Sequence, residues 1–562
     1  MSENLTKDKM IDGKLFEALF LGGASSLHEN AQVVNDLNVF PIPDGDTGEN
    51  MFLTMKGGLD GLKKTDDGTI SARAESVASG MLLGARGNSG VILSQLFHGL
   101  SLGLKGKATA TIKEFAEAMK KGVECAYGAV AKPVEGTMLT VAREASQKAG
   151  EKITSETTTL EFFEDFLAEM RLSLERTPDL LAVLREAGVI DSGGAGLVYI
   201  GEGFIKALRG EEIKGLDVVT GSSPASLDFS KFTEDSEMVF GYCTETLVQL
   251  QRSKTDVDNF SVDFLIKYLE TIGDSIVAFK TGTVVKIHVH TMTPYKVLEY
   301  CQKFGEFLTV KIENMTLQHN ETSEVKERAK PNEMDKFKVK RARRKYAVVT
   351  VASGDGLTEV FKEMGADYVV SGGQTNNPSA EDFLSAFDEV NADHVFVLPN
   401  NGNIILAAKQ AAEMYTDSVI HVIESKSIGQ GYAALSMLDY EAGEADDLVS
   451  LLYENMEGAV TGNVAKSVRT TSLNGVEIKE GEYMGFADKV MYVSEPTRLK
   501  AACGLVGKIA GDKNYLIAVF GQDLSDSEKS GLTAFIAENY PSLEFYEIEG
   551  GQDVYDYIFI CQ

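Results

Sequence analysis

The sequence predicts a multidomain protein with an all-helical N-terminal region followed by α/β middle and C-terminal regions. Three observations support this prediction. Residues 1 to about 210 show helix starts and apolar residues at helical spacing, without a convincing alternating strand. Residues 221–224, Gly-Ser-Ser-Pro, have the composition of a linker. From residue 346 onward, short apolar runs alternate with helical patterns, which is typical of a parallel sheet.

Helix starts are well marked in the N-terminal region, predicted as a domain of residues 1–210. Thr111 with Glu114, and Thr158 with Glu161, have the spacing of capping boxes. Thr177 precedes a proline and is predicted to cap a further helix. Eight or nine helical segments follow from these signals, which favours an antiparallel helical bundle or barrel.

Residues 35–51 form the stretch around which this region is organised. The two prolines at 41 and 43 cannot continue a helix, so the segment must be extended or turning. Asp44 and Asp46 alternate around a glycine, so in an extended segment both carboxylates point the same way. Two hard oxygen ligands beside a helix start suit Mg²⁺ with bound phosphates. An Asp-rich turn with an N-cap is the alternative interpretation.

Three further glycine-rich turns precede helices, at residues 84–90, 135–138 and 191–196. Each combines small residues with a hydroxyl or acidic group and a helix start. Any one of them alone is explained by a tight interhelical turn. Four such turns in one helical region, including the Asp-containing one, predict a nucleotide-phosphate site at one end of the bundle.

The motifs LNVFPIPDGDTGENM, GARGNSG, GTM and DSGGAG occur in this order on predicted helix starts. In this order they resemble the nucleotide-binding domain of dihydroxyacetone-kinase-type enzymes. The PxPDGDTG form on a chain of this length resembles the bacterial fatty acid kinase A subunits. The resemblance implies a barrel of eight antiparallel helices that binds ATP and Mg²⁺.

The resemblance also implies roles for individual residues. Asp44 and Asp46 would hold Mg²⁺ as the catalytic aspartates, and the third ligand position of the family falls near Asn38, an amide here. The family's phosphate- and nucleotide-binding turns match Gly87, Asn88, Ser89, Gly90, Gly136, Thr137, Met138, Asp191, Gly193, Gly194 and Ala195. Thr47 and Asn50, at the start of the helix after Asp46, complete the candidate set.

Residues 211–228 are predicted to be a linker, and residues 229–325 a small α/β middle domain with strands at 240–245 and 283–290 and a helix at 262–272. His288 and His290 share one face of their strand, and Cys243 lies on the other strand. Two histidines and a cysteine form a plausible three-ligand zinc set, with Glu245 or water as the fourth ligand. The alternative is a pair of half-buried histidines near an inert thiol.

Residues 326–345 contain a basic tract that is better explained as a solvated linker and edge strand than as a nucleic-acid or lipid site. Residues 346–562 are predicted to be an α/β C-terminal domain. A parallel, doubly wound sheet would hold the strands 346–351, 368–371, 394–398 and 419–423, and a final α/β piece the strands 515–520, 543–548 and 557–560. The polar loops after the first strands are where open α/β sheets bind ligands or partners. The resemblance implies that this domain docks a separate fatty-acid-binding protein.

Composition excludes several classes of function. The 562 residues carry a formal net charge of −30, which argues against nucleic-acid binding because a polyanion would be repelled. No apolar run is long enough to span a bilayer, and the N-terminus lacks a signal-peptide core. Five scattered cysteines fit a reducing cytoplasm, so we expect a cytoplasmic protein. The oligomeric state stays open, with a homodimer as one option.

The favoured function is an ATP- and Mg²⁺-dependent kinase that phosphorylates the carboxylate of a fatty acid held by a separate fatty-acid-binding protein. An ionised carboxylate needs no general base, which agrees with the absence of an obvious catalytic triad in the helical region. One alternative is a kinase for a small hydroxyl substrate such as dihydroxyacetone. The other is a non-catalytic nucleotide sensor or scaffold.

Overall fold

The computed structural model of the chain forms two compact units. One unit combines Met1–Asp217 with Lys340–Gln562, and the other is Val218–Val339, so the middle segment is an insertion between the two parts of the first unit. The structure describes residues 9–38, 45–65, 67–211, 242–257, 260–269, 271–281, 283–314, 343–374, 376–488, 490–511 and 513–562. Among these residues, no helix is both long enough and apolar enough to cross a membrane.

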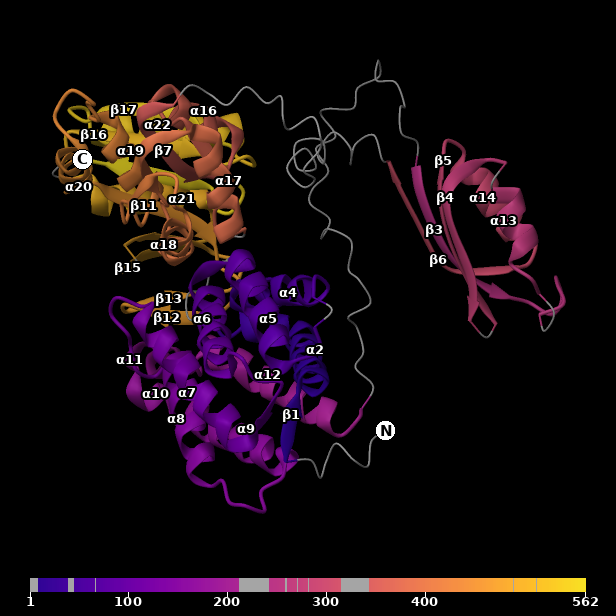
Figure 1. Cartoon of the computed structure of the whole chain (residues 1–562). Coiled ribbons are helices and arrows are strands. Elements are labelled where there is room, and N and C mark those ends of the chain that lie inside the picture. Colours follow the sequence, from indigo (N-terminus) through magenta and orange to yellow (C-terminus); the bar gives the residue numbers. More distant parts are fainter. Residues whose placement is uncertain are drawn as a thin grey trace. The chain divides into compact units, whose positions relative to one another are not determined.

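The N-terminal part is helical, as predicted (Figure 1). Its described helices are α2 (Gly13–Glu29), α3 (Ala31–Asn35), α4 (Thr47–Leu62), α5 (Ile70–Gly84), α6 (Gly87–Leu104), α7 (Ile112–Gly128), α8 (Met138–Glu151), α9 (Thr159–Glu175), α10 (Thr177–Leu180), α11 (Ala182–Ala187) and α12 (Ser192–Leu208). The capping boxes at Thr111 and Thr158 are confirmed, because each threonine accepts from the third helical N–H while the glutamate there bonds back to the cap. The barrel of eight helices stays a prediction.

Two expectations for this part were wrong. Strands β1 (Met10–Asp12) and β2 (Thr109–Thr111) pair antiparallel, although no strand was expected. Each has three residues, which is too short for alternating hydrophobicity to be visible. Thr177 is the first residue of α10 and not its N-cap, a position that Arg176 occupies. The Thr177 hydroxyl instead donates to the carbonyl oxygen of Leu174.

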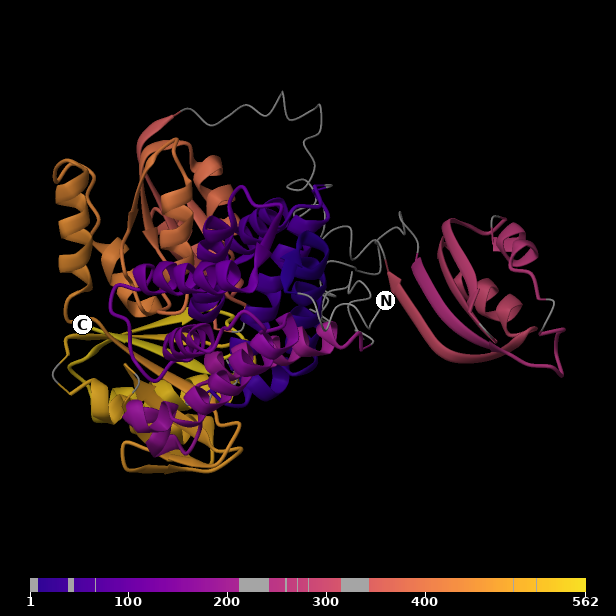
Figure 2. The ribbon, with the colours of Figure 1, turned by 60° about the horizontal axis from the view of Figure 1, so that its bottom comes forward.

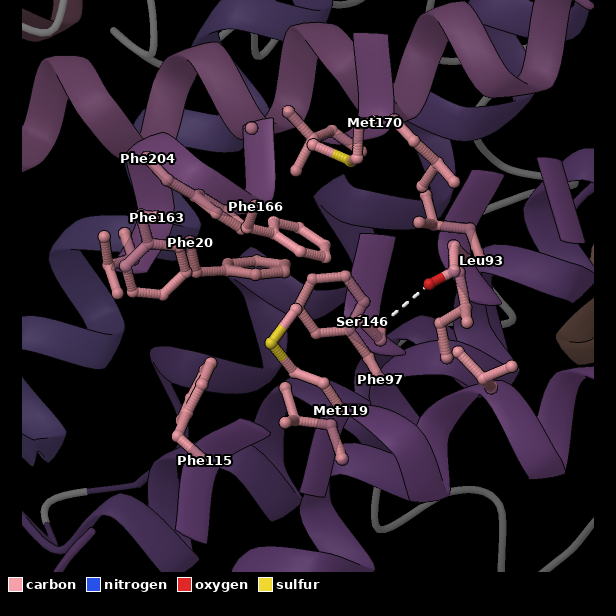
Figure 3. A pocket seen from close by; sticks show the side chains of 18 of the residues that line it. Phe20, Leu93, Phe97, Phe115, Met119, Ser146, Phe163, Phe166, Met170 and Phe204 are labelled. Carbon is pink, nitrogen blue, oxygen red and sulfur yellow. Dashed lines mark hydrogen bonds between the residues drawn. The ribbon is translucent and has the colours of Figure 1, made fainter. Parts of the chain in front are cut away.

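The helices enclose one continuous hydrophobic core. Helices α2 and α12 approach so closely that a Cβ on Gly203 would lie 2.1 Å from the carbonyl oxygen of Gly22. Within the core lies a cavity of about 90 Å³, lined mainly by aromatic and aliphatic side chains such as Phe20, Phe97 and Phe166 (Figure 3). Ser146 is a polar residue of its lining, and its hydroxyl donates to the carbonyl oxygen of Ala142. An apolar cavity of this kind has no group to bind phosphate.

The described residues of the middle unit form a four-stranded antiparallel sheet in the order β4-β5-β3-β6 with two short helices. Its elements are β3 (Tyr242–Leu250), α13 (Asp263–Leu269), β4 (Gly273–Thr281), β5 (Val284–Thr291), α14 (Pro294–Cys301) and β6 (Gly305–Asn314). The two predicted strands correspond to β3 and β5, and the predicted helix to α13. Strands β4 and β6 and helix α14 were not predicted.

The C-terminal part begins with the predicted parallel sheet, in the order β10-β9-β7-β8. Its strands are β7 (Arg344–Ala352), β8 (Tyr368–Ser371), β9 (Ala392–Leu398) and β10 (Val419–Val422). Adjacent residues of β7 enter different cores, with Val349 facing α17 (Ala380–Val390) and α18 (Ile405–Met414). Val348 joins the core that contains α16 (Asp355–Glu363). Helices therefore cover both faces, which is the doubly wound arrangement.

A second, six-stranded sheet follows, in the order β15-β14-β11-β18-β16-β17. Its last strands are the yellow arrows in Figure 2. The strands are β11 (Val460–Lys466), β14 (Tyr483–Ala487), β15 (Val490–Glu495), β16 (Tyr515–Phe520), β17 (Glu544–Glu549) and β18 (Tyr557–Cys561), with a separate hairpin of β12 (Thr471–Leu473) and β13 (Val476–Ile478). The helices are α19 (Ile428–Ser436), α20 (Ala445–Met456), α21 (Arg498–Ile509) and α22 (Asp526–Asn539). The sequence predicted β16, β17 and β18 but not the other strands.

Candidate nucleotide site

Asp46 is the N-cap residue of α4, yet its carboxylate makes no capping hydrogen bond. Burial raises the pKa of Asp46 to about 6, although hydrogen bonds from the side chains of Asn50 and Asn377 oppose this shift. Asp44 falls within residues 39–44, outside the described residues. A half-buried carboxylate without a capping partner at a helix start is suited to a cation.

Asn38 joins two helix starts. Its side-chain oxygen accepts hydrogen bonds from the hydroxyls of Thr47 at 2.8 Å and Ser192 at 3.2 Å. Thr47 begins α4 and Ser192 begins α12, so the first and last glycine-rich turns lie side by side. Because both lone pairs of the Asn38 oxygen are engaged, binding a metal there would require one hydroxyl to move away.

The turn at residues 84–90 packs against α4. Gly87 has a φ of +57°, and a Cβ on it would lie 2.7 Å from Asn50 Nδ2. A Cβ on Gly90 would lie 2.3 Å from Thr54 Oγ1, so only glycine allows α6 to start this close to α4. Asn88 and Ser89 are half-buried between these two glycines.

Asp191 joins the two remaining turns. Its carboxylate accepts hydrogen bonds from the backbone N–H groups of Gly194, at 2.7 Å, and Met138, the first residue of α8. Burial raises the pKa of Asp191 to about 6 against these hydrogen bonds. Beside Met138, Gly136 adopts a φ of +83° and Thr137 donates its hydroxyl hydrogen bond to the carbonyl oxygen of Val134. Gly193, Gly194 and Ala195 are buried.

These contacts bring the four predicted turns together. Asn38 links α4 to α12, Asp191 links α12 to α8, and Gly87 and Gly90 link α4 to α6. The starts of four helices thus gather at one end of the helical part. Helix N-termini present free N–H donors and a partial positive charge, which is the chemistry that binds phosphate.

The C-terminal part contributes residues that the sequence did not predict. Asn377, in the loop after β8, donates its side-chain N–H to Asp46, and Arg86 donates at 2.7 Å to the backbone oxygen of Asn377. Asn88 donates to Asn403 of the loop after β9 at 3.2 Å. Arg469 donates to the backbone oxygens of the loop that contains Asn38. These partners lie hundreds of positions from the turns, so no local pattern pointed to them.

The predicted binding edge of the parallel sheet therefore lies against the helical part. The loops after β8 and β9 contain Asn377 and Asn403, and both contact the helix starts. Behind them, a small pocket at the carboxyl ends of the strands is lined in part by Ser353, Gly373 and Asn400. Binding of a ligand in this pocket stays a prediction.

The proposed zinc ligands lie on paired strands. Cys243 of β3 is opposite His290 of β5, and Glu245 is opposite His288 in the same antiparallel register. The side chains of these residues lie outside the described part, so the zinc site stays a prediction. Among the described residues, no group of three His, Cys, Asp or Glu side chains is arranged to hold a metal.

Three family models match successive parts of the chain. Residues 41–206 match the DAK2 domain, residues 239–322 the middle domain of FakA-like proteins, and residues 347–562 the C-terminal domain of the same fatty acid kinase proteins. Protein YloV of Bacillus subtilis (strain 168) is 40% identical over 564 residues, which cover 98% of this chain and 99% of the relative. The chain belongs to the FakA-like family of fatty acid kinase proteins.

Another relative of this FakA-like chain is an uncharacterized protein of Staphylococcus aureus (strain MRSA252), 38% identical over 562 residues and covering 98% of this chain and 99% of the relative. Among solved structures, the DegV family protein Cg2579 of Corynebacterium glutamicum has a TM-score of 0.30 at 15% identity and covers 39% of this chain and 96% of its own. The dihydroxyacetone kinase of C. freundii with AMP-PNP and Mg²⁺ has a TM-score of 0.27 at 18% identity, covering 37% and 36%. At such low TM-scores, neither likeness establishes a function for this chain.

Proposed function

We propose that this chain is the ATP-binding component of a fatty acid kinase, which transfers the γ-phosphate of ATP to the carboxylate of a fatty acid. The observation that carries the proposal is the gathering of four helix starts around Asp46, Asn38 and Asp191. The membership in the FakA-like family supports it. The second product besides ADP is then an acyl phosphate, which is suited to phospholipid synthesis.

The residues at this end fit Mg²⁺. The Asp46 carboxylate makes no capping hydrogen bond to α4, and Asp44 lies two residues before it in the sequence. Asn38 would support the Asp46 turn through Thr47, and would become a ligand only on release of a hydroxyl. Carboxylate and amide oxygens are the ligands that Mg²⁺ prefers. When bound, the ion neutralises charge on the β- and γ-phosphates during transfer.

The helix starts supply the remaining interactions with ATP. The N–H groups of Gly87, Asn88 and Ser89 at the start of α6, and of Gly193 at the start of α12, would hold phosphate oxygens. Thr137 and Met138 would contact the nucleotide. The fatty acid carboxylate, already ionised at neutral pH, attacks the γ-phosphorus as the bond to the bridging oxygen of ADP breaks. No general base is required, so the chain needs only to bind phosphates and orient the nucleophile.

A separate fatty-acid-binding protein is the proposed carrier of the substrate. The cavity in the helical core is apolar, and its lining contains no residue of the four turns. An acyl chain held by a partner avoids the need for a long apolar channel beside the phosphates. The C-terminal domain is the proposed docking platform, because its strand-end loops already reach the helix starts.

The test is ATP turnover by the full chain with a long-chain fatty acid, with and without a fatty-acid-binding protein from the same cell. We expect ADP and acyl phosphate only when both the fatty acid and the carrier are present. Turnover with dihydroxyacetone and not with fatty acid would favour a small-molecule kinase. Nucleotide binding without turnover under every condition would favour a sensor or scaffold.

A further inference from the structure

Asn377 of the C-terminal part contacts the end of the helical part at which the four helix starts gather. Its side chain is 2% exposed, and its Nδ2 group donates a hydrogen bond to Oδ2 of Asp46. The same Nδ2 atom would lie 3.5 Å from a Cβ built on Gly87. Asn377 is therefore between the Asp46 carboxylate and the phosphate-binding turn that begins α6.

Arg86 fixes the backbone at Asn377 and in the residues that follow it. Arg86 Nη1 donates to the Asn377 carbonyl oxygen at 2.7 Å, and the Arg86 and Ser379 backbones form an isolated antiparallel bridge. Arg86 Nη2 also lies 3.8 Å from the carboxylate of Asp382, in the first turn of α17. The amide is thus held in the site by the contacts of its own carbonyl group and of the segment that follows it.

The oxygen end of the Asn377 amide is different from its nitrogen end. The Oδ1 atom of Asn377 is buried and has no hydrogen-bond partner among them. A buried amide oxygen without a hydrogen-bond partner lowers the free energy of unfolding. In native proteins such an atom is often explained by a bound ion or water. Rotation of the amide by half a turn exchanges the two ends, and it would place Oδ1 against the Asp46 carboxylate. Two oxygens in contact are repelled unless a cation lies between them.

We propose that Asn377 belongs to the metal–nucleotide site, and that its side-chain oxygen binds, directly or through a coordinated water, the divalent cation held by Asp46. This inference rests on the proposed function. Without the cation, the amide donates to Asp46 as the structure shows. With the cation, the amide presents its oxygen, which is a hard ligand of the kind that Mg²⁺ prefers. The C-terminal domain then completes the site of the helical domain in the same chain.

The test measures binding of Mn²⁺ to the full chain in the presence of saturating ADP, by electron paramagnetic resonance of the free ion. Mn²⁺ replaces Mg²⁺ as a visible probe, and ADP avoids turnover. Asn377→Leu keeps a similar volume but removes both polar ends, and we expect it to weaken Mn²⁺ binding about tenfold or more. Asn377→Asp restores an oxygen ligand, and we expect binding at least as tight as in the wild type.

Gln410→Met is the matched control. Gln410 lies in the same contact between the two parts, where its side chain donates at 2.5 Å to the carbonyl oxygen of Leu82. Its hydrogen-bond partners among the described residues, Leu82, Ser94 and Gln95, are not predicted site residues. We expect this variant to bind Mn²⁺ as the wild type does. Thermal unfolding with and without Mn²⁺ and ADP gives a second readout, in which the ligand-induced rise in Tm is smaller for Asn377→Leu than for the wild type and is kept in Asn377→Asp.

Three results would overturn the inference. Unchanged Mn²⁺ binding by Asn377→Leu would make the residue a hydrogen-bond donor between domains only. Equal weakening by the Leu and Asp variants would indicate a structural role, and tighter binding by Asn377→Leu would show that the amide obstructs the site. In each of these cases the wild type still binds Mn²⁺ with ADP and the proposed function stands. A wild type that binds none overturns both proposals.

Discussion

Arg469 and Asn38 are 431 positions apart in the sequence, yet the Arg469 guanidinium donates a hydrogen bond to the Asn38 backbone oxygen. A second Nη atom of Arg469 donates to the backbone oxygen of Asp36 at 3.2 Å. Burial lowers the pKa of Arg469, but the group stays charged at neutral pH. The C-terminal part therefore holds the segment that leads to the proposed metal-binding turn.

Arg469→Ala should loosen this segment. The loss of two charge-assisted hydrogen bonds should destabilise the contact by about 2–3 kcal/mol, and hydrogen exchange in residues 31–38 and 45–51 should accelerate. Lys466→Ala, a change at an exposed cation on the neighbouring strand β11, is the control and should leave exchange unchanged. Equal exchange in the Arg469 variant and the wild type would show that the contact does not order the turn.

Asp46→Ala should abolish phosphoryl transfer while the helical part stays folded. The carboxylate is the proposed Mg²⁺ ligand, so we expect turnover to fall by about 100-fold or more, and we expect the same of Asp44→Ala. Asp60→Ala on the same helix is the control, because Asp60 is exposed and forms a surface ion pair with Lys63. Turnover and far-UV circular dichroism are measured together, and near-normal activity of the Asp46 variant contradicts the assignment.

Asp46→Asn should stabilise the metal-free protein at neutral pH. The folded-state pKa of about 6 is above the ordinary value of 3.8, so the folded protein binds the proton more tightly than the unfolded one. The free energy of unfolding therefore falls as the pH rises from about 4 through 6. At pH 7.5 the variant should be more stable by at most about 3 kcal/mol, and the gain should shrink toward pH 4.5.

Urea unfolding in the presence of a chelator measures this difference. The addition of Mg²⁺ with ADP should stabilise the wild type more than the variant, because the ion compensates the buried charge only where a carboxylate is present. If the two proteins are equally stable at pH 7.5 without metal, then burial does not penalise the Asp46 carboxylate.

The middle domain should carry about one zinc per chain. The register of β3 and β5 places Cys243 opposite His290, with His288 two residues away on the same strand. Replacement of both histidines by alanine should remove the metal, as measured by elemental analysis of the purified protein. Cys125→Ala is the control, because this cysteine belongs to α7 of the helical part. A wild-type protein that is stable without bound zinc would contradict the zinc site and favour ordinary packing of these residues.

The features that the sequence predicted are local ones. Each capping box, and the Asp191 turn, spans only a few residues. The side chain and the backbone N–H group that it bonds therefore belong to the same short segment, which makes the hydrogen bond predictable from the sequence. The gathering of the turns at one end was also predictable, because antiparallel packing places the N-termini of every second helix at the same end of a bundle. Roles for these residues in binding remain predictions.

The features that the sequence did not predict depend on distant partners. Strand β11 contains Gly462, a weak strand former, but a Cβ there would lie 2.5 Å from Ile509 of α21, so packing requires the glycine. Asn377 reads as an ordinary loop residue because its partner, Asp46, is 331 positions away. Tertiary contacts override local preference at both positions.

The contact between the two parts of the first unit also has a consequence for synthesis on the ribosome. Ala85 and Val91 of the helical part are buried in one core with Phe383 and Ile404, which are translated about 300 residues later. At the elongation rate of about 5–20 residues per second, Asn377 follows Asp46 by roughly 20–70 s. During that interval the nascent helical part presents this apolar surface and leaves the proposed metal-binding turn uncovered. We expect the nascent chain at this stage to be a target for chaperones until the C-terminal residues of this core have emerged from the ribosome.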